Sequence, residues 1–343
     1  QPPAKGWAME KVGEIQAAQV VAILPKVVRT AITVAGAAVG ATVAVSAITV
    51  LEGLWVRGRL LGRDYGVEST AAPAEFGTAY DGDPLNLALL GDSLAVGVGA
   101  GTREATVGFL LAEGLSRASG RPVRLHQVAA VGSESSELAA QLCALEESVA
   151  HPEVAVIVVG GNDVMHLQSI RGAADHLAET VRELRRRGCQ VVVATCPDMG
   201  TVRPFFQPLR FFAHWLSRVL ATAQTIVVLR NGGRAVSLAD TVGPMFRKDP
   251  HLMFSTDNLH PSALGYARAA EVLLPSVCAA AGYRADPAAT VPHRIYRKGG
   301  RYPLAWYAFR ASRQGGTEIT PSRDRHGRPA FLSGIPFPKW QHA

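Results

Sequence analysis

Asn86-Leu-Ala-Leu-Leu-Gly-Asp-Ser93 is the stretch that decides the fold of this 343-residue chain. A short, mostly apolar run leads directly into Gly91-Asp92-Ser93, which is typical of a buried strand that ends in a polar loop. Four more apolar runs of similar length follow it, at 123–128, 154–159, 191–195 and 225–229. We therefore predict five buried strands, the first of which carries a serine to one end of a sheet.

The segments between these runs have the spacing of amphipathic helices. Apolar residues recur at helical intervals near 104–119, 134–148, 171–187 and 209–223. A last helix is expected over 262–281, where Pro261 suits the start of its first turn. Strands that are apolar throughout and alternate with helices predict a parallel sheet covered on both faces. The expected fold class is therefore α/β, a three-layer α/β/α sandwich over residues 84–283.

An N-terminal segment, 1–63, precedes this domain and differs from it in composition. Its residues 30–51 are 22 consecutive uncharged residues, a length that matches the hydrocarbon core of a bilayer. We predict a transmembrane helix here, a signal-anchor with its N-terminus inside. A cleaved signal peptide ending near Ala47 and a helix packed on protein are the two alternatives. A linker rich in Gly, Pro, Ala and acidic residues, 64–83, is expected to join the two parts.

The positive charge of the chain is concentrated in a C-terminal extension, 284–343. The formal net charge is +7, and residues 287–343 hold ten Lys and Arg against two acidic residues. Residues 1–286 hold 25 basic and 26 acidic residues, so the domain itself is nearly neutral. Basic residues interspersed with aromatic ones suit nucleic acid, an anionic membrane surface or wrapping around the domain. With an apolar span in the same chain, we favour the last two and expect no nucleic-acid partner.

The four cysteines give no framework for the fold. They are too sparse for a disulfide scaffold, and they lack the clustered Cys and His spacing of a zinc site. We expect Cys143, Cys189, Cys196 and Cys278 to be buried free thiols.

Polar residues gather where the predicted strands end. Gly91-Asp92-Ser93 follows the first strand, Gly132-Ser133 the second and Gly160-Gly161-Asn162-Asp163 the third. Asp257-Asn-Leu-His260 precedes the last helix. Since the carboxyl ends of parallel strands meet at one edge of a sheet, these four loops are expected to converge on a single site.

Ser93, His260 and Asp257 are the three residue types of a hydrolytic triad. A serine hydroxyl becomes nucleophilic when a base takes its proton, and an acid orients that base and stabilises its charge. Ser93 alone is better explained as a helix cap, because serine is so frequent at helix starts. The chain also contains a second Asp-x-x-His, Asp163-Val-Met-His166. We prefer the later copy because it lies in a polar loop just before the last helix, and His166 remains the alternative base.

Acyl transfer also requires hydrogen-bond donors for the oxyanion that forms on the carbonyl oxygen. The candidates are the backbone N–H groups of Ser93 and Gly132 and the side-chain amide of Asn162, each at a strand end. Gly132 and Asn162 are also common turn residues, so either alone is weak evidence. The evidence for an oxyanion site is that these residues occur in order along the chain, each after the expected strand.

Together, these four loops resemble the four sequence blocks of the SGNH (GDSL) hydrolases. The Ala- and Arg-rich composition and the N-terminal apolar span look similar to the exported actinobacterial, particularly mycobacterial, esterases of that family. The resemblance spans about residues 84–283. It implies a flavodoxin-like sheet, Ser93 as nucleophile, Asp257 and His260 completing the triad, and Ser93, Gly132 and Asn162 forming the oxyanion hole. Gly132 lacks the Asn that often precedes it in that family, and neither the anchor nor the basic tail belongs to the family's common core.

The function predicted from the sequence is that of a serine esterase, which forms an acyl-enzyme on Ser93 and needs no metal or organic cofactor. Its substrate would be a small-molecule, lipid or glycan ester, and the anchor would hold the domain on the outer side of the plasma membrane. A glycan O-acyltransferase and a non-catalytic, membrane-tethered binding protein are the alternatives. The acyl chain would enter beside Leu94, Val96 and the loop after the fourth strand, where Phe205, Phe206, Pro208 and Phe211 could form an apolar wall. Burial of these aromatic residues in the core is the alternative, and we favour it.

The motifs of two other enzyme classes are incomplete in this chain. An α/β-hydrolase elbow requires Gly-x-Ser-x-Gly, but Ala95 stands at the second glycine position. The run Gly97-Val-Gly99-Ala-Gly101 resembles a dinucleotide fingerprint, yet Thr102 takes the place of its third glycine. We expect these glycines to let the backbone approach the site closely.

Overall fold

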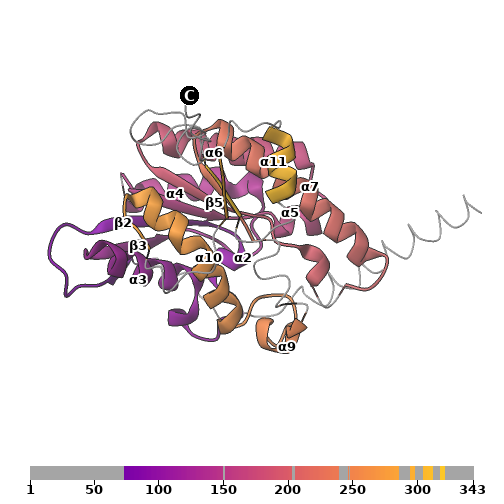
Figure 1. Ribbon diagram of the computed structural model, residues 1–343, viewed down its shortest axis with the longest axis horizontal. Coiled ribbons are helices and arrows are strands. Elements are labelled where there is room, and N and C mark those ends of the chain that lie inside the picture. The colour runs from indigo at the N-terminus through magenta and orange to yellow at the C-terminus, as the bar shows by residue number, and fades with distance from the viewer. Residues whose placement is uncertain are drawn as a thin grey trace, which may run out of the picture. The chain divides into compact units, whose positions relative to one another are not determined.

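The computed structural model describes residues 73–149, 151–202, 205–238, 246, 248–285, 294–297, 304–311 and 317–320. Their centre is one mixed sheet with the strand order β1-β3-β2-β4-β5-β6-β8-β7 (Figure 1). The five inner strands are all parallel: β2 (Leu85–Gly91), β3 (Val123–Gln127), β4 (Val154–Val158), β5 (Gln190–Thr195) and β6 (Arg234–Ser237). Their order in space, second-first-third-fourth-fifth along the chain, is the flavodoxin-like order. The predicted α/β fold with a mostly parallel sheet is therefore confirmed.

Two layers of helices cover this sheet, as Figure 1 shows. One layer contains α3 (Val107–Ser119) and α10 (Ala263–Ala281), which pack against each other and on the sheet. The opposite layer contains α4 (Leu138–Ser148), α6 (Ile170–Arg186) and α7 (Leu209–Arg230). Each layer has its own apolar cluster, so the sheet is buried on both faces.

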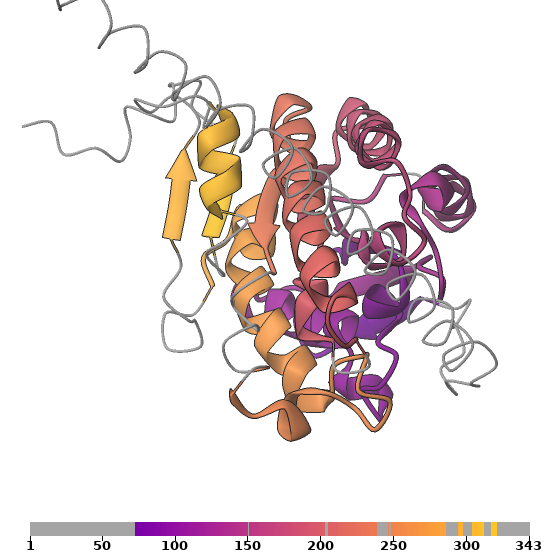
Figure 2. The same cartoon turned by 90° about the vertical axis from the view of Figure 1, so that its right-hand side faces the viewer.

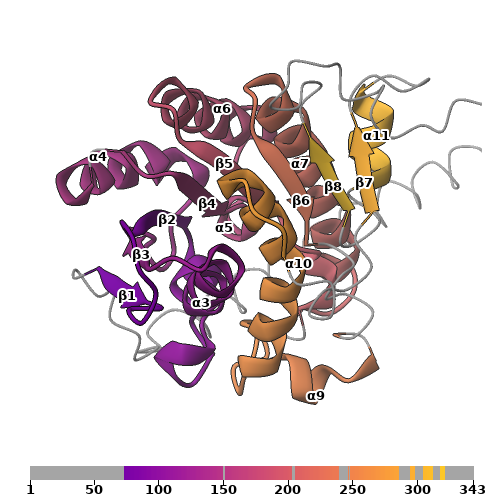
Figure 3. The same cartoon turned by 60° about the vertical axis from the view of Figure 1, so that its left-hand side comes forward.

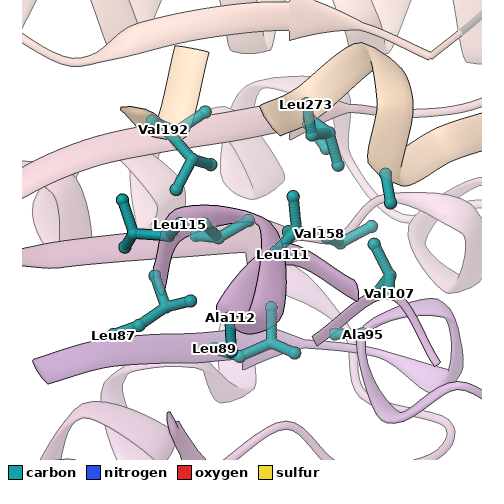
Figure 4. Close-up of a cluster of buried hydrophobic side chains, with 14 of the residues drawn as sticks. Leu87, Leu89, Ala95, Val107, Leu111, Ala112, Leu115, Val158, Val192 and Leu273 are labelled. Atoms are coloured by element: carbon teal, nitrogen blue, oxygen red, sulfur yellow. The ribbon is translucent and has the colours of Figure 1, made fainter. Parts of the chain in front are cut away.

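Strand β2 shows why its sequence is apolar at successive positions. Successive side chains of a strand point to opposite faces. Leu87 and Leu89 accordingly pack in the cluster under α3 and α10, which Figure 4 draws, while Ala88 and Leu90 pack under the other layer. All four are at most 1% exposed. Both faces of the strand therefore require apolar residues, which explains the continuous run.

Four of the five predicted strands are confirmed, and the fifth prediction, 225–229, is wrong. Those residues form the last turns of α7, in which Thr225, Val228 and Leu229 are buried. The fifth parallel strand is β6, which begins after Gly232 and Gly233. A short apolar run has the same appearance in a buried helix and in a buried strand, so periodicity alone could not separate them.

The edges of the sheet come from segments that the sequence analysis placed outside the domain. Within the predicted linker, β1 (Ala74–Phe76) pairs antiparallel with β3, so this part of it is an edge strand. The C-terminal extension contributes β7 (Arg294–Arg297), α11 (Leu304–Ala311) and β8 (Thr317–Thr320). Strand β8 pairs antiparallel with β6, and α11 packs against α7 (Figures 2 and 3). These parts of the basic extension therefore belong to the domain.

The predicted transmembrane helix, 30–51, lies outside the described residues. Within the part of the chain that the structure describes, α7 alone is long and apolar enough to cross a membrane. Half of its most apolar stretch is buried inside the protein, as in the core helix of an α/β domain. Three of the four cysteines are buried free thiols as predicted, whereas Cys143 is exposed.

Candidate active site

Ser93 lies where β2 passes into the short helix α2 (Ser93–Val96), at the carboxyl end of the sheet. Asp92 is the N-cap of this helix, because its carboxylate accepts a hydrogen bond from the Leu94 N–H at 2.9 Å. Gly91 has φ of +133°, and a Cβ atom here would overlap the carbonyl oxygen of Val158 in β4. Glycine thus allows the turn to press against β4, and Ser93 itself does not serve as the cap.

Asp257, His260 and Ser93 form a continuous chain of hydrogen bonds. The Oδ2 atom of Asp257 is 2.6 Å from Nδ1 of His260, and Nε2 of His260 is 2.9 Å from the Oγ atom of Ser93. His260 is 5% exposed and Ser93 is 9% exposed, so the chain is largely shielded from water. This arrangement of acid, base and hydroxyl can transfer a proton from Ser93 to His260.

A tight loop holds the acid and the base. Asn258 adopts the left-handed conformation, with φ of +58°, and Oδ1 of Asp257 accepts the N–H groups of Leu259 and His260 at 2.9 Å each. The glycine run after α2 approaches this loop closely, as predicted. A Cβ atom on Gly99 would lie 2.8 Å from the carbonyl oxygen of Pro261, so no larger residue fits between the two loops.

The environment of Asp257 favours its charged form. Burial acts to raise the pKa of this carboxyl, but hydrogen bonds from His260, from the Ser255 hydroxyl and from backbone N–H groups outweigh it. The pKa of Asp257 consequently lies well below its ordinary value. An ionised Asp257 is able to orient the His260 ring and to stabilise an imidazolium on it.

At Asp92, the effect of burial on the pKa outweighs that of the hydrogen bonds. Burial raises its pKa to about 7, the Leu94 N–H counteracts this, and the nearby charge of Asp163 adds to the rise. Asp92 lines the cavity beside Ser93, yet it is 2% exposed. The carboxyl of the residue that precedes Ser93 therefore has a pKa near neutral pH.

The three predicted oxyanion donors differ in position. Asn162 lies in the first turn of α5 (Gly161–Met165), directly after β4, and lines the cavity together with Ser93. Its Nδ2 atom donates to the carbonyl oxygen of Ser133 at 3.0 Å, which leaves the second amide hydrogen for a ligand. Gly132 has φ of +84° and is exposed on the neighbouring loop, outside the residues that line the cavity.

The second Asp-x-x-His is built differently from the first. The carboxylate of Asp163 accepts hydrogen bonds from the Ser135 N–H at 3.2 Å and from the Ser135 hydroxyl at 3.0 Å. Nδ1 of His166 is 2.6 Å from Oε1 of Glu134. An alternative base would have to bind the Ser93 hydroxyl. That hydroxyl is bonded to His260, and His166 is bonded to Glu134 instead.

An apolar cavity opens at Ser93 and His260 and encloses about 950 Å³, its open mouth included. Its apolar lining includes Leu94, Met165, Met199, Val202, Phe246 and Phe254. The residues of the possible apolar wall do not line the cavity, and neither does Val96. Phe205 is buried, as the core alternative predicts, whereas Phe206 and Phe211 are exposed. The loop after β5 does contribute, through Met199 and Val202.

Gln141, a buried polar residue of α4, belongs to this site although it was not predicted from the sequence. Its side chain accepts the Gly91 N–H at 2.8 Å, donates to the Gly91 carbonyl at 2.8 Å and donates to the Ser133 hydroxyl at 3.1 Å. It thereby joins the loop of Ser93 to that of Gly132. Gln141 lies between the buried Leu138 and Leu142 on the apolar face of the helix. A polar residue on that face was the signal available in the sequence.

Three comparisons place these features among known proteins. The model of the GDSL-like lipase/acylhydrolase family matches residues 89–268, more than half of the chain. The GDSL-like esterase Rv1075c of Mycobacterium tuberculosis (strain ATCC 25618 / H37Rv) is 43% identical over 189 residues. That match covers 55% of this chain and 60% of the relative, so it spans less than two thirds of that protein.

Solved structures are similar at lower identity. The lipase Lip_vut3 from a goat rumen metagenome has a TM-score of 0.47 and 22% identity, covering 58% of this chain and 98% of that one. TesA has a TM-score of 0.46 and 19% identity, covering 57% of this chain and 99% of that one.

Proposed function

Because the chain belongs to the GDSL-like lipase/acylhydrolase family, we propose that it is a serine esterase that works through an acyl-enzyme on Ser93. The observation that carries this proposal is the continuous Asp257–His260–Ser93 hydrogen-bond chain at the mouth of an apolar cavity. A cavity of this kind accommodates the apolar part of an ester and leaves its carbonyl beside the hydroxyl.

In the first half of the reaction, Oγ of Ser93 attacks the ester carbonyl while Nε2 of His260 takes the hydroxyl proton. The oxyanion of the tetrahedral intermediate accepts hydrogen bonds from the Ser93 N–H and the Asn162 amide, which line the cavity. The proposed third donor is the N–H of Gly132, which lies outside the cavity lining on the turn that Asn162 binds through Ser133. The His260 imidazolium, stabilised by Asp257, then gives its proton to the departing alcohol. The acyl group remains on Ser93.

In the second half, water replaces the alcohol. His260 takes a proton from this water, which attacks the acyl-enzyme carbonyl. The tetrahedral intermediate collapses, the proton passes to Oγ of Ser93, and the carboxylic acid leaves. Each step uses only side chains and backbone N–H groups of this chain.

The proposal also concerns location. Residues 30–51 would anchor the chain in the plasma membrane, with the esterase domain on its outer side. In support, a helix of 22 uncharged residues is about 33 Å long, close to the roughly 30 Å of the hydrocarbon core. Membranes from cells that express the full chain should retain it after a carbonate wash. Release into the supernatant would contradict the anchor.

The esterase is tested with the full chain in detergent on nitrophenyl esters of rising acyl length, beside Ser93→Ala. We expect the variant to lose at least about 10⁴-fold in kcat, as triad serines do. Ser169→Ala is the matched control, because Ser169 is a serine N-cap whose hydroxyl accepts the Gly172 N–H in α6. It should lose about 1 kcal/mol of stability and keep its activity. Full activity in Ser93→Ala would remove the proposal.

A further inference from the structure

Helix α5 and the loop before α4 are joined by three links that involve consecutive loop residues. Asn162 donates to the Ser133 carbonyl, His166 is bonded to Glu134, and Asp163 accepts from Ser135. The loop side carries Gly132 immediately before this run, and the helix side carries Asn162 in its first turn. The two predicted oxyanion donors outside the Ser93 loop are therefore held by one clamp.

Glu134 and His166 form the outer link of this clamp. Their side chains are 19% and 36% exposed, and the short Nδ1–Oε1 distance of 2.6 Å indicates a strong, charge-assisted hydrogen bond. Glu134 is itself fixed, because it and Glu137 form a reciprocal capping box at the start of the next helical turn. The carboxylate that binds His166 is thus fixed to its own loop, so this hydrogen bond connects the loop to the end of α5.

The consequence of this link lies in the orientation of the Asn162 amide. Its Nδ2 atom must face the Ser133 carbonyl to make the 3.0 Å hydrogen bond. If the loop moved away, the amide would lose the partner that keeps its nitrogen, rather than its oxygen, on the side of the cavity. An oxyanion donor acts only when it is held in place before the reaction begins.

We propose that His166, bonded to Glu134, is a positioning residue that holds the Gly132–Ser133 turn against α5 and thereby orients the Asn162 amide toward the developing oxyanion. This proposal rests on the proposed esterase function. It assigns a role to the second Asp-x-x-His: Asp163 fixes the inner end of the clamp at the buried Ser135, and His166 fixes the outer end.

The test compares His166→Ala with His166→Asn in the full chain. Asparagine places an amide nitrogen near the position of Nδ1 and keeps a donor for Glu134, whereas alanine removes it. We expect His166→Ala to lower kcat on a nitrophenyl ester by about 10- to 100-fold, the range for a misplaced catalytic geometry, with KM nearly unchanged. His166→Asn should regain most of this loss. His176→Ala, on the exposed face of α6, is the control and should match the wild type.

A double-mutant cycle with Asn162→Ala shows whether His166 acts through that amide. In the Asn162→Ala background, the further loss on removing His166 should shrink to a few-fold at most, because the group being oriented is gone. Losses that multiply fully in the double variant would overturn the proposal, as would equal activity of His166→Ala and wild type. A His166→Asn variant as impaired as His166→Ala would do the same.

Two reference variants separate this proposal from the esterase itself. If Ser93→Ala and His260→Ala are inactive while His166→Ala is normal, only the positioning role fails. If Ser93→Ala is fully active, the esterase proposal fails first. Melting temperatures of all variants are measured in parallel, and a loss of kcat that follows a loss of folded protein would count against positioning.

Discussion

The two Asp-x-x-His copies have the same spacing and opposite arrangements. In Asp257-Asn-Leu-His260 the acid is bonded to the histidine of its own copy, and that histidine is bonded to Ser93. In Asp163-Val-Met-His166 the acid and the histidine each bind a different residue of another loop. The spacing therefore does not decide which copy becomes a proton relay.

The backbone around each copy explains the difference. The later copy lies in a loop, where Asn258 in the left-handed conformation lets the Asp257 carboxylate fold back over the following N–H groups. Both of its oxygens are then occupied within the copy. The earlier copy spans α5, where Asp163 is buried and His166, at the C-cap, is partly exposed. The buried Asp163 therefore binds the buried Ser135, and the partly exposed His166 binds Glu134.

Substitutions of the two histidines should differ most in their effect on kcat. His260→Gln should lower kcat by about 10⁶-fold, because removal of a triad histidine costs nearly as much as removal of the whole triad. Initial rates and a pre-steady-state burst on nitrophenyl acetate measure this loss. A His166→Gln variant serves as the counterpart and should stay within about 100-fold of the wild type. A larger loss in His166→Gln than in His260→Gln would reverse the assignment of the base.

The two acids should differ next. Asp257→Asn keeps the shape but removes the charge that stabilises the His260 imidazolium and fixes its tautomer, so we expect about 10⁴-fold in kcat. Asp163→Asn should lose much less, because Asp163 is bonded to Ser135 instead of His260. Steady-state kinetics of the pair, with KM determined separately, give both values. Similar kcat values in the two variants would contradict the distinction.

Asp163 should instead matter for stability. Asp163→Ala leaves the buried N–H and hydroxyl of Ser135 without their acceptor, which costs about 1–3 kcal/mol. Urea denaturation followed by circular dichroism measures this loss. Asp175→Ala is the control, since Asp175 pairs with Arg171 on the open surface of α6 and such pairs contribute little. Equal stability of the two variants would show that Ser135 finds another acceptor.

The features that could be predicted from the sequence depend on neighbouring residues along the chain. Ser93 and Asn162 directly follow buried strands, so their convergence needed only the rule for parallel sheets. What escaped prediction depended on contacts between distant segments. Strand β6 was misplaced because Thr225–Leu229 completes a long helix, and the cavity wall was misplaced because Phe206 and Phe211 point outward. Gln141 was missed since nothing local shows that its amide faces Gly91.

A pH-dependent effect is expected at Asp92, which belongs to the Ser93 loop and feels the charge of Asp163 in the earlier copy. The pKa of Asp92 is about 7 in the folded chain against 3.8 without the fold, chiefly because of burial. Between about pH 4 and 7 the folded chain thus holds a proton that the unfolded chain has lost. Stability from this group is complete below pH 4 and falls as the pH rises, by up to about 1.4 kcal/mol per pH unit.

Asp92→Asn should remove this slope, so the free energies of unfolding of variant and wild type should diverge as the pH is raised from about 5 to about 8. Asp163→Asn should also reduce the slope, because burial raises the pKa of Asp163 itself and because the Asp163 charge contributes to the raised pKa of Asp92. Urea denaturation of the three proteins at each pH gives their free energies of unfolding. Protonation of groups that all three proteins share cancels when these free energies are subtracted. Parallel curves for Asp92→Asn and wild type would show that Asp92 is solvated in the folded protein and that the Ser93 loop is more open than its 2% exposure implies.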